Sequence, residues 1–379
     1  MIDKILKFSI ANRLLIVLLT AVVAAYGVYS LKQLPIDAVP DITNNQVQIN
    51  ITSPGLSPEE MEKQVTNPIE NVLAGIPGLE STRSISRNGF SQVTAIFYDN
   101  VNIYFARQQI TERLSEVKES LPTNTDPKMG PISTGLGEIY MWTVEYEHPQ
   151  GKGALGVAGK PGWQPDGSYL TPEGHKLRNE TELSSYLRTV QDWIIRPQLK
   201  GVVGLAEVDS IGGHIRQYHV EPHLEKINAL GITFDDIADA LKANNISIGA
   251  GYVEKNQESF LVKGDGRIES PSEIGTIVVS TRNGIPIHIN DIADVVIGKE
   301  MRTGSSSENG QEVVIGTAMM LIGANSRTVA LAVDKKMGEI SKTLPPDIKA
   351  KTILNRTKLV DATITTVSKN IVEGALLVI

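Results

Sequence analysis

The chain has 379 residues, a formal net charge of −7 at pH 7 and no cysteine. This length allows two or three domains with hydrophobic cores of ordinary size. The acidic balance, without any strongly basic stretch, excludes nucleic acid as a partner, and the absence of cysteine excludes disulfides and thiolate metal sites.

The first apolar segment predicts a transmembrane helix over residues 14–32. Residues 14–31 are an uncharged run that as a helix would extend about 27 Å, close to the roughly 30 Å hydrocarbon core of a bilayer. Basic residues precede the run and acidic residues follow it, which places the amino terminus in the cytoplasm and the next segment outside. A cleaved signal peptide is the alternative, although the run is longer than such peptides usually need. Residues 1–13 alternate apolar and basic side chains and predict an amphipathic helix at the cytoplasmic interface.

The following hundred residues have the pattern of an α/β sandwich. Ser57, with acidic residues after it, starts a predicted helix, and Asn88-Gly89 is a strong hairpin signal between two strands. The order β-α-β-β-α and then a further strand is that of a ferredoxin-like unit. The predicted elements are a strand at 47–52, a helix from Ser57, strands at 79–86 and 92–98, a helix at 105–121 and a strand at 140–146.

A second, similar round follows. Leu73-x-Gly75-x-x-Gly78-Leu79 matches Leu199-x-Gly201-x-x-Gly204-Leu205, so a helix leading through a Gly-x-x-Gly turn to a strand occurs twice. This indicates duplicated α/β sandwiches and not a solenoid, because the period is too long. The further predicted elements are helices at 183–199, 234–243 and 326–344 and strands at 205–211, 218–221, 276–280, 313–321 and 348–353.

Two segments depart from this alternation. Residues 148–176 are rich in glycine and proline and are predicted to be a surface insertion or loop, with isolated Trp163 and Tyr169. From Ile371 onward the sequence becomes apolar, which we interpret as the start of a second membrane helix, with a helix packed on a core as the alternative.

Few residues have the pattern of a chemical site. Glu138 follows Gly135 and Gly137, so its carboxylate could contact a divalent ion where the backbone bends closely; a loop-to-strand junction with a solvated glutamate is the alternative. Residues 214, 219 and 223 are histidines, but Pro222 keeps the last two off one helical face, and surface histidines are the simpler interpretation. No Ser/His/Asp or Cys/His arrangement is present, so an enzyme is not expected and no cofactor is predicted.

Several motifs together resemble the resistance-nodulation-division (RND) superfamily of efflux pumps. Three motifs resemble these pumps generally: LPIDAVPD at 34–41, SPGLSPEE at 53–60 and VTNPIE at 65–70. Four resemble the heavy-metal branch: YFARQ at 104–108, GPISTGLGEI at 130–139, QDW at 191–193 and RPQL at 196–199. The insertion, with GKPGWQ at 159–164 and Gly174, is most similar to the cobalt-zinc-cadmium pumps.

The resemblance implies an α+β membrane protein with a transmembrane helix followed by periplasmic ferredoxin-like β-α-β sandwiches. It maps residues 33–133 to a first porter subdomain, residues 134–180 with 274–352 to a second, residues 181–273 to half of a docking subdomain, and residues 353–379 to a connector with the start of transmembrane helix 2. The short hairpin turn at 255–257 implies only a modest arm toward a neighbouring protomer.

The resemblance also implies a function. Such a pump is a homotrimer in the inner membrane of a Gram-negative cell. It exports divalent zinc, cobalt or cadmium in exchange for protons, with a periplasmic adaptor protein and an outer-membrane channel. The proton-carrying carboxylates and most metal ligands belong to parts of the family outside this chain, so Glu138 is the one candidate contact for the transported ion here. The alternatives are an RND pump for copper or silver, one for organic drugs, and a singly anchored periplasmic binding or scaffold protein.

Overall fold

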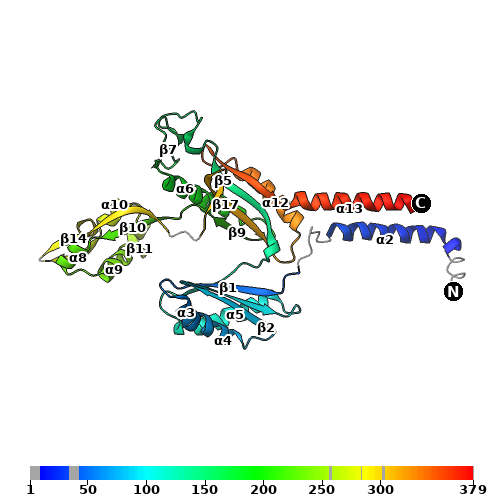
Figure 1. Cartoon of the computed structure of the whole chain (residues 1–379), viewed down its shortest axis with the longest axis horizontal. Coiled ribbons are helices and arrows are strands. Elements are labelled where there is room, and N and C mark those ends of the chain that lie inside the picture. Colours follow the sequence, from blue (N-terminus) through cyan, green and yellow to red (C-terminus); the bar gives the residue numbers. More distant parts are fainter. Residues whose placement is uncertain (1–8, 34–41, 256–257, 283, 301–303, 379) are drawn as a thin grey trace.

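The computed structural model describes residues 9–33, 42–255, 258–282, 284–300 and 304–378. They form three α/β units with separate hydrophobic cores, and two helices extend from one end of the body (Figure 1). The expected α+β content is therefore confirmed. Most of the predicted amphipathic helix, residues 1–8, and the motif at 34–41 lie outside the described residues.

The first unit is a four-stranded antiparallel sheet covered by helices on one face. Val47, Ile49 and Ile51 of the central strand are fully buried because the strand alternates, and they pack with helical residues such as Ile69 and Ile110. The sheet order is β2-β3-β1-β4. The elements are β1 (Gln46–Thr52), α3 (Pro58–Met61), η1 (Glu62–Thr66), α4 (Asn67–Leu73), β2 (Leu79–Arg87), β3 (Phe90–Phe97), α5 (Ile103–Val117), η2 (Lys118–Ser120) and β4 (Asp126–Met129).

Two local predictions hold in this unit and one is wrong. Ser57 caps α3 in a capping box with Glu60, and Gly89 has the positive φ that the hairpin turn needs. The strand predicted at 140–146 does not join this sheet, because β4 occupies the edge beside β1. It belongs instead to the second unit, where its pairing partners are more than 150 residues further along the chain.

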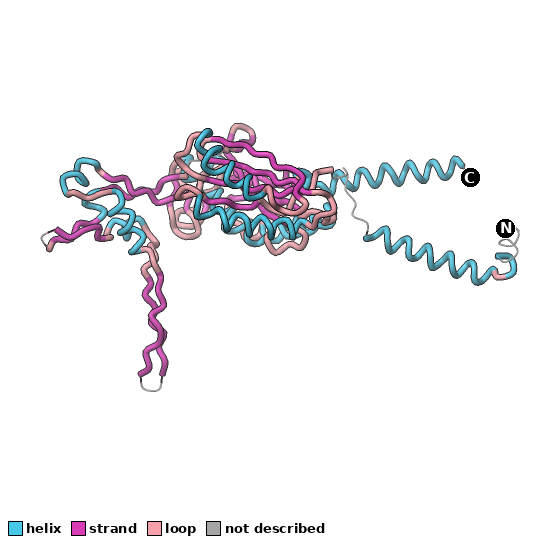
Figure 2. Tube along the Cα trace, turned by 90° about the horizontal axis from the view of Figure 1, so that it is seen from below, coloured by secondary structure: helices cyan, strands magenta, loops and turns pink. Residues whose placement is uncertain are grey.

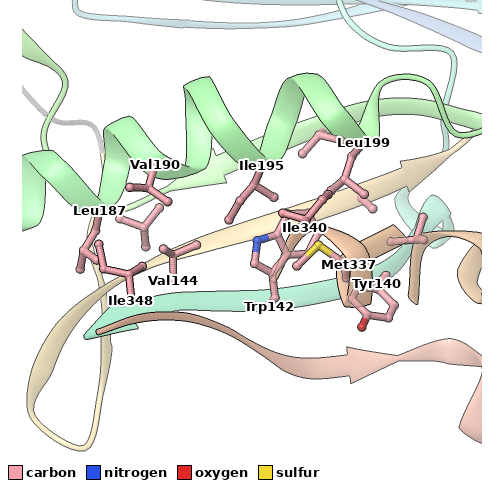
Figure 3. Packing of buried hydrophobic residues seen from close by; sticks show 14 of the residues in the cluster. Tyr140, Trp142, Val144, Leu187, Val190, Ile195, Leu199, Met337, Ile340 and Ile348 are labelled. Atoms are coloured by element: carbon pink, nitrogen blue, oxygen red, sulfur yellow. The ribbon is translucent and has the colours of Figure 1, made fainter. Parts of the chain in front are cut away.

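The second unit is assembled from distant segments. Its sheet has the order β16-β17-β5-β18, and β9 also pairs with β17. Figure 3 shows the helical residues Leu187 and Val190 on the side of Val144 in the sheet, and Ile195 and Leu199 on the side of Trp142. The elements are η3 (Gly135–Gly137), β5 (Glu138–Tyr146), α6 (Glu180–Thr189), η5 (Val190–Ile195), α7 (Arg196–Leu199), β9 (Leu205–Ile211), β16 (Ser306–Glu308), β17 (Gln311–Met320), α12 (Ser326–Ile340) and β18 (Ile348–Asn355).

A proline interrupts a helix in both of these units in the same way. Pro68 lies in the first turn of α4, directly after the π-helical turn η1, and Pro197 lies in the first turn of α7, directly after the π-helical turn η5. Proline has no backbone N–H and its ring clashes with the preceding turn of an α-helix. A single π turn inside an α-helix is a rare feature, and here one precedes the proline in both units. The sequence repeat therefore extends to the irregular features of the two helices.

The third unit lies away from the other two along the long axis of the molecule (Figure 1). Its core is built mainly from isoleucines, including Ile227, Ile237 and Ile289. The pair β10–β15 connects it with the second unit. The elements are β10 (Arg216–Pro222), α8 (Leu224–Leu230), α9 (Phe234–Asn244), α10 (Pro271–Gly275), β13 (Val278–Arg282), β14 (Ile285–His288), α11 (Ile289–Ile292) and β15 (Ala293–Lys299).

A hairpin projects from this unit as a two-stranded ribbon (Figure 2). It consists of β11 (Ser247–Lys255), with 9 residues, and β12 (Glu258–Asp265), with 8 residues. At about 3.3 Å per residue such strands extend roughly 30 Å. The arm is thus longer than the short turn at 255–257 indicated, since turn length does not fix strand length; Asn256 and Gln257 lie outside the described residues.

The insertion after β5 is more ordered than its composition indicated. Short strands β6 (Gly162–Trp163), β7 (Tyr169–Leu170) and β8 (Lys176–Leu177) form a three-stranded sheet after the turn η4 (Pro149–Gly151). Trp163 and Tyr169 are buried, at 3% and 0% exposure, so their prediction as isolated surface-loop residues is wrong. The reason is that they pack against Tyr146 and Tyr186 of the second unit, with ring centroids 5.1 to 5.7 Å apart.

The two terminal helices are α2 (Arg13–Gln33) and α13 (Arg356–Val378), which extend from the same end of the body. Within the described residues, no helix has both the length and the apolar character required to cross a membrane. The transmembrane helix predicted at 14–32 is therefore not confirmed, nor is a second one from Ile371. In α13, charged residues recur through the helix: Lys358, Asp361, Lys369 and Glu373.

Candidate metal-binding residues

Glu138 is the first residue of β5 and follows a tight turn. Gly137 is buried in this turn, and a Cβ there would lie 3.2 Å from the backbone oxygen of Met320 and against the Ser133 hydroxyl. Only glycine fits this close approach. The Glu138 side chain is exposed, beside Met319 in the register of β5 and β17, so the turn presents the carboxylate to solvent at the end of the sheet.

The base of α13 holds the same turn in place. Arg356 is buried, and its guanidinium donates a hydrogen bond to the backbone oxygen of Leu136. Nearby, the Tyr140 hydroxyl donates to the Asp334 carboxylate at 2.7 Å and contacts the Thr352 hydroxyl at 2.6 Å. Burial raises the pKa of Tyr140 well above its usual value, so this hydroxyl remains a donor in alkaline solution as well as at neutral pH. Glu138 therefore stands on a rigid support.

The three neighbouring histidines do not form a common group. His219 contacts the Gln217 side chain at 3.3 Å, His223 lies 3.4 Å from the Asp294 carboxylate, and His214 is buried. Among the described residues, these three are not brought together at ligand distance. The prediction of surface histidines agrees with the part-exposed His219 and His223 and is wrong for His214, which is buried.

A different trio does converge. Glu147, His148 and Asp347 each offer one ligand-type atom, and these atoms all lie within 4.8 Å of one another. Sequence reasoning missed this group because His148 and Asp347 are 199 positions apart. The one local signal was a Glu-His pair at the end of a strand, which without its partner is indistinguishable from an ordinary surface pair.

The motif residues at 191–192 form a hydrogen-bond network between the covering helices and the sheet. The indole N–H of Trp142 donates to the side-chain oxygen of fully buried Gln191 at 2.9 Å. The Ser210 hydroxyl, 3.3 Å from the Gln191 amide nitrogen, donates to the Asp192 carboxylate at 2.6 Å, which also pairs with Arg188 at 2.6 Å. The π turn η5 brings these polar groups to the sheet, where each buried donor finds an acceptor.

Comparison with known proteins gives a consistent result. A profile of the AcrB/AcrD/AcrF family matches residues 5–379. The nickel-cobalt-cadmium resistance protein NccA of Alcaligenes xylosoxydans xylosoxydans is 53% identical over 379 residues, which are 100% of this chain and 35% of that protein. The cobalt-zinc-cadmium resistance protein CzcA of Cupriavidus metallidurans is 49% identical over 100% of this chain and 33% of its own length. The chain thus spans about a third of these relatives.

More distant relatives share the same fold. The cation efflux system protein CusA of Escherichia coli is 30% identical over 100% of this chain and 33% of its own length. A solved structure described as a heavy metal efflux pump, crystal form II, superposes with a TM-score of 0.80 at 30% identity, covering 99% of this chain and 34% of that chain. The architecture of the three units is therefore that of the corresponding third of this pump.

Proposed function

Because the chain belongs to the AcrB/AcrD/AcrF family, with which residues 5–379 match, we propose that it is part of a proton-driven exporter of divalent heavy-metal cations of the zinc, cobalt and cadmium class. The observation that carries the proposal is the 53% and 49% identity to two proteins named for nickel, cobalt, zinc and cadmium resistance. The relatives' names add nickel to the candidate ions, and borderline ligand preferences of these ions overlap.

The three units fit the parts of such a pump. On this proposal the first unit is one porter subdomain, the second unit is the other, and the third unit is half of the docking region. The bounds of the units differ from those that the resemblance implies. Residues 181–211, mapped to the docking subdomain, pack in the second unit, and residues 274–299, mapped to the second porter subdomain, pack in the third. The ribbon β11–β12 would contact a neighbouring protomer of a homotrimer. Its exposed apolar side chains support this role, because they would be covered in such a contact: Tyr252, Val253, Phe260 and Leu261.

The terminal helices would lie toward the inner membrane. The side chains of α2 that are exposed include Leu14, Leu18 and Val22 at 55% or more, and so large an exposed apolar surface is normally covered in the complete assembly. In the whole pump we expect lipid or further helices of the pump to cover it, with the three units on the periplasmic side. An adaptor protein and an outer-membrane channel would complete the export path.

Within this chain, Glu138 is the proposed contact for the transported ion. A single exposed carboxylate binds a cation weakly, since tight sites use three or four ligands. Weak contact suits a residue on an export path, where an ion must also be released.

Metal tolerance tests the proposal. The complete pump gene, with its adaptor and channel, would be expressed in a Gram-negative strain that lacks its own metal pumps. Growth would be scored against zinc, cobalt, cadmium, nickel, copper, silver and organic drugs. Tolerance to one or more of the first four ions is the expected result. Tolerance only to copper and silver, or only to drugs, would contradict it, and no tolerance at all with a fully assembled pump would favour a binding or scaffold role.

Glu138→Gln in the same pump tests the residue. We expect reduced tolerance without loss of the folded protein, because the substitution removes the charge and keeps the shape. Glu80→Gln is the matched control, as Glu80 is an exposed glutamate on strand β2. Equal tolerance of both variants and the parent would remove Glu138 from the ion path.

A further inference from the structure

Two paired strands bring three metal-ligating residue types together at their ends. Glu147 and His148 follow β5 directly, and Asp347 immediately precedes β18, the strand beside β5. The Glu147 backbone N–H donates to the Asp347 backbone oxygen at 2.8 Å, and His148 Nδ1 lies 3.2 Å from Asp347 Oδ1. The position of the group is thus fixed by the sheet and not by a free loop.

The Asp347 side chain is held from several sides. Its backbone has φ of 61°, a left-handed conformation that Asp tolerates better than most residues. Pro345 and Pro346 precede it, and the Tyr169 hydroxyl of the insertion donates to the Pro346 backbone oxygen at 2.7 Å. Gly162 approaches so closely that a Cβ there would lie 3.1 Å from Asp347 Oδ2. The carboxylate is therefore confined between the insertion and the sheet.

The group borders an acidic cavity of about 520 Å³. The cavity lining contains five glutamates and two lysines: Glu145, Glu147, Glu180, Glu308, Glu312, Lys349 and Lys351. The lysines are paired, Lys349 with Glu145 at 3.2 Å and Lys351 with Glu308 at 2.5 Å. The lining thus has a formal charge of −3 from these seven residues, and this negative charge attracts cations to the cavity beside His148.

We propose that Glu147, His148 and Asp347 bind a divalent cation of the zinc, cobalt or nickel type at a site separate from Glu138. One imidazole and two carboxylates suit borderline metals, with water completing the coordination. His148 Nδ1 and Asp347 Oδ1, 3.2 Å apart, are already near the separation of about 3.4 Å that tetrahedral bonds of about 2.1 Å require. Glu147 is exposed and has its carboxylate within 4.8 Å of both, so its side chain can close the remaining distance. The bound ion would fasten the insertion to the sheet.

The simpler alternative is a plain contact between His148 and Asp347 with no metal. The metal site and the plain contact differ in the role of Glu147, because only the metal site requires the Glu147 carboxylate in addition to His148 and Asp347. The site does not rest on the proposed transport function, since its occupancy is measured without transport.

Cobalt absorption tests the site. The 379-residue chain, purified in detergent, would be titrated with Co²⁺ alone, followed by displacement with Zn²⁺; ligand-field absorption in the visible range reports protein ligands on cobalt. We expect saturable binding that His148→Gln and Asp347→Asn weaken at least about tenfold, with Glu147→Gln also weaker. Asp347→Asn preserves shape and tolerates a positive φ, and the other two variants decide the question if it fails to fold.

Two controls make the outcome specific. His223→Gln removes a histidine that lies beside one carboxylate, Asp294 at 3.4 Å. Glu80→Gln removes an exposed glutamate on β2 that has no role in either proposal. Both variants should bind Co²⁺ as the parent does. Unchanged binding in the His148 and Asp347 variants, or equal weakening in all variants, would overturn the site. A loss confined to His148 and Asp347, with Glu147→Gln unaffected, would reduce it to a two-ligand contact and overturn the three-residue proposal. Failure here leaves the export proposal standing, which metal tolerance tests separately.

Discussion

At the residue scale, the two units of the repeat place a glycine against a valine at the same point. Gly78 and Gly204 each precede a strand with φ of +80° and +86°. A Cβ on Gly78 would lie 2.6 Å from Val101 Cγ2, and one on Gly204 would lie 2.6 Å from Val329 Cγ2. Both the backbone conformation and the space therefore require glycine, whereas the first glycine of each Gly-x-x-Gly turn has no such restriction.

Gly204→Ala should destabilise the second unit by about 2–4 kcal/mol, since the substitution combines a positive φ with a steric overlap. Gly201→Ala, in the same turn but with open space at its Cβ, is the matched control and should change stability little. Chemical denaturation followed by tryptophan fluorescence measures both. Adding Val329→Ala to Gly204→Ala should recover part of the loss, and no recovery would show that only the backbone matters.

The buried amide of Gln191 makes a second prediction at this scale. Gln191→Leu leaves the Trp142 indole N–H without its acceptor in the core, which costs about 1–3 kcal/mol of unfolding free energy. Trp142→Phe combined with Gln191→Leu should cost less than the sum of the single changes, because no buried donor then remains unpaired. Gln108→Leu on an exposed helix face is the control. Strict additivity of the double variant would argue that the hydrogen bond contributes nothing.

At the element scale, the insertion is attached to the second unit by aromatic side chains. Tyr146, Trp163, Tyr169 and Tyr186 contact one another across the join, and the Tyr146 hydroxyl donates to the Leu183 backbone oxygen at 3.1 Å. Aromatic pairs of this kind add about 0.5–1.5 kcal/mol each beyond their buried area. The insertion therefore behaves as part of the unit and not as an appended loop.

Burial gives this element a dependence on alkaline pH. It raises the pKa of Tyr146, Tyr169 and Tyr186 above the usual value, so these phenols stay neutral in the folded protein while the unfolded chain ionises near pH 10. Above this pH unfolding therefore releases protons. The stability that depends on these buried tyrosines is fully present below about pH 10, and the free energy of unfolding falls as the pH rises further. Unfolding midpoints from pH 8 to 11 should show this decline. Tyr169→Phe should reduce the slope, and exposed Tyr98→Phe should not; equal slopes would contradict the assignment.

At the scale of the whole molecule, the three units have separate cores, but the tryptophan residues that report unfolding by fluorescence are not distributed equally among them. The three tryptophans, Trp142, Trp163 and Trp193, all belong to the second unit or its insertion. Tryptophan fluorescence therefore follows one unit, whereas calorimetry follows all three. Multi-core chains commonly unfold in more than one step.

Ile110→Ala tests this independence. Ile110 is fully buried in the first core, and its truncation should cost about 2–5 kcal/mol there. We expect a calorimetric transition to move to lower temperature while the fluorescence midpoint stays in place. Val208→Ala, in the second core, is the matched variant and should move the fluorescence midpoint. A fluorescence shift with Ile110→Ala would instead mean that the first two units unfold as one.

How far the sequence predicts this molecule depends on the range of each interaction. The capping box at Ser57 and the hairpin at Gly89 are local, and both were predictable. The sequence predicts the strand at 140–146 correctly but places it in the wrong sheet. The reason is that its partner β17 is distant in the chain, and no residue near the strand indicates that the two pair. The burial of Trp163 and Tyr169 could not be predicted for the same reason. The glycines and prolines around them are typical of an exposed loop, whereas the surface that buries them belongs to other parts of the chain.

The same difference between local and long-range interactions decides which candidate metal-binding residues could be predicted from the sequence. Glu138 could be proposed as an ion contact from the sequence because its glycine turn consists of consecutive residues, and this role stays a prediction. The contact of His148 with Asp347 depends on how β18 aligns with β5, which one strand alone cannot reveal. The length of the ribbon β11–β12 was likewise underestimated from its turn.

The second unit is interrupted in the chain, since β5 ends at Tyr146 and its neighbours β17 and β18 lie between Gln311 and Asn355. The first unit is complete once Met129 has been synthesised and can fold as soon as it emerges. The second must wait with an unpaired strand edge while some 160 residues, including the whole third unit, are produced; at about 5–20 residues per second this takes roughly 10–30 seconds. A strand edge that stays exposed for this time can pair with other chains and aggregate. Correct folding of the second unit therefore requires that β5 stays unpaired until β17 and β18 have been synthesised.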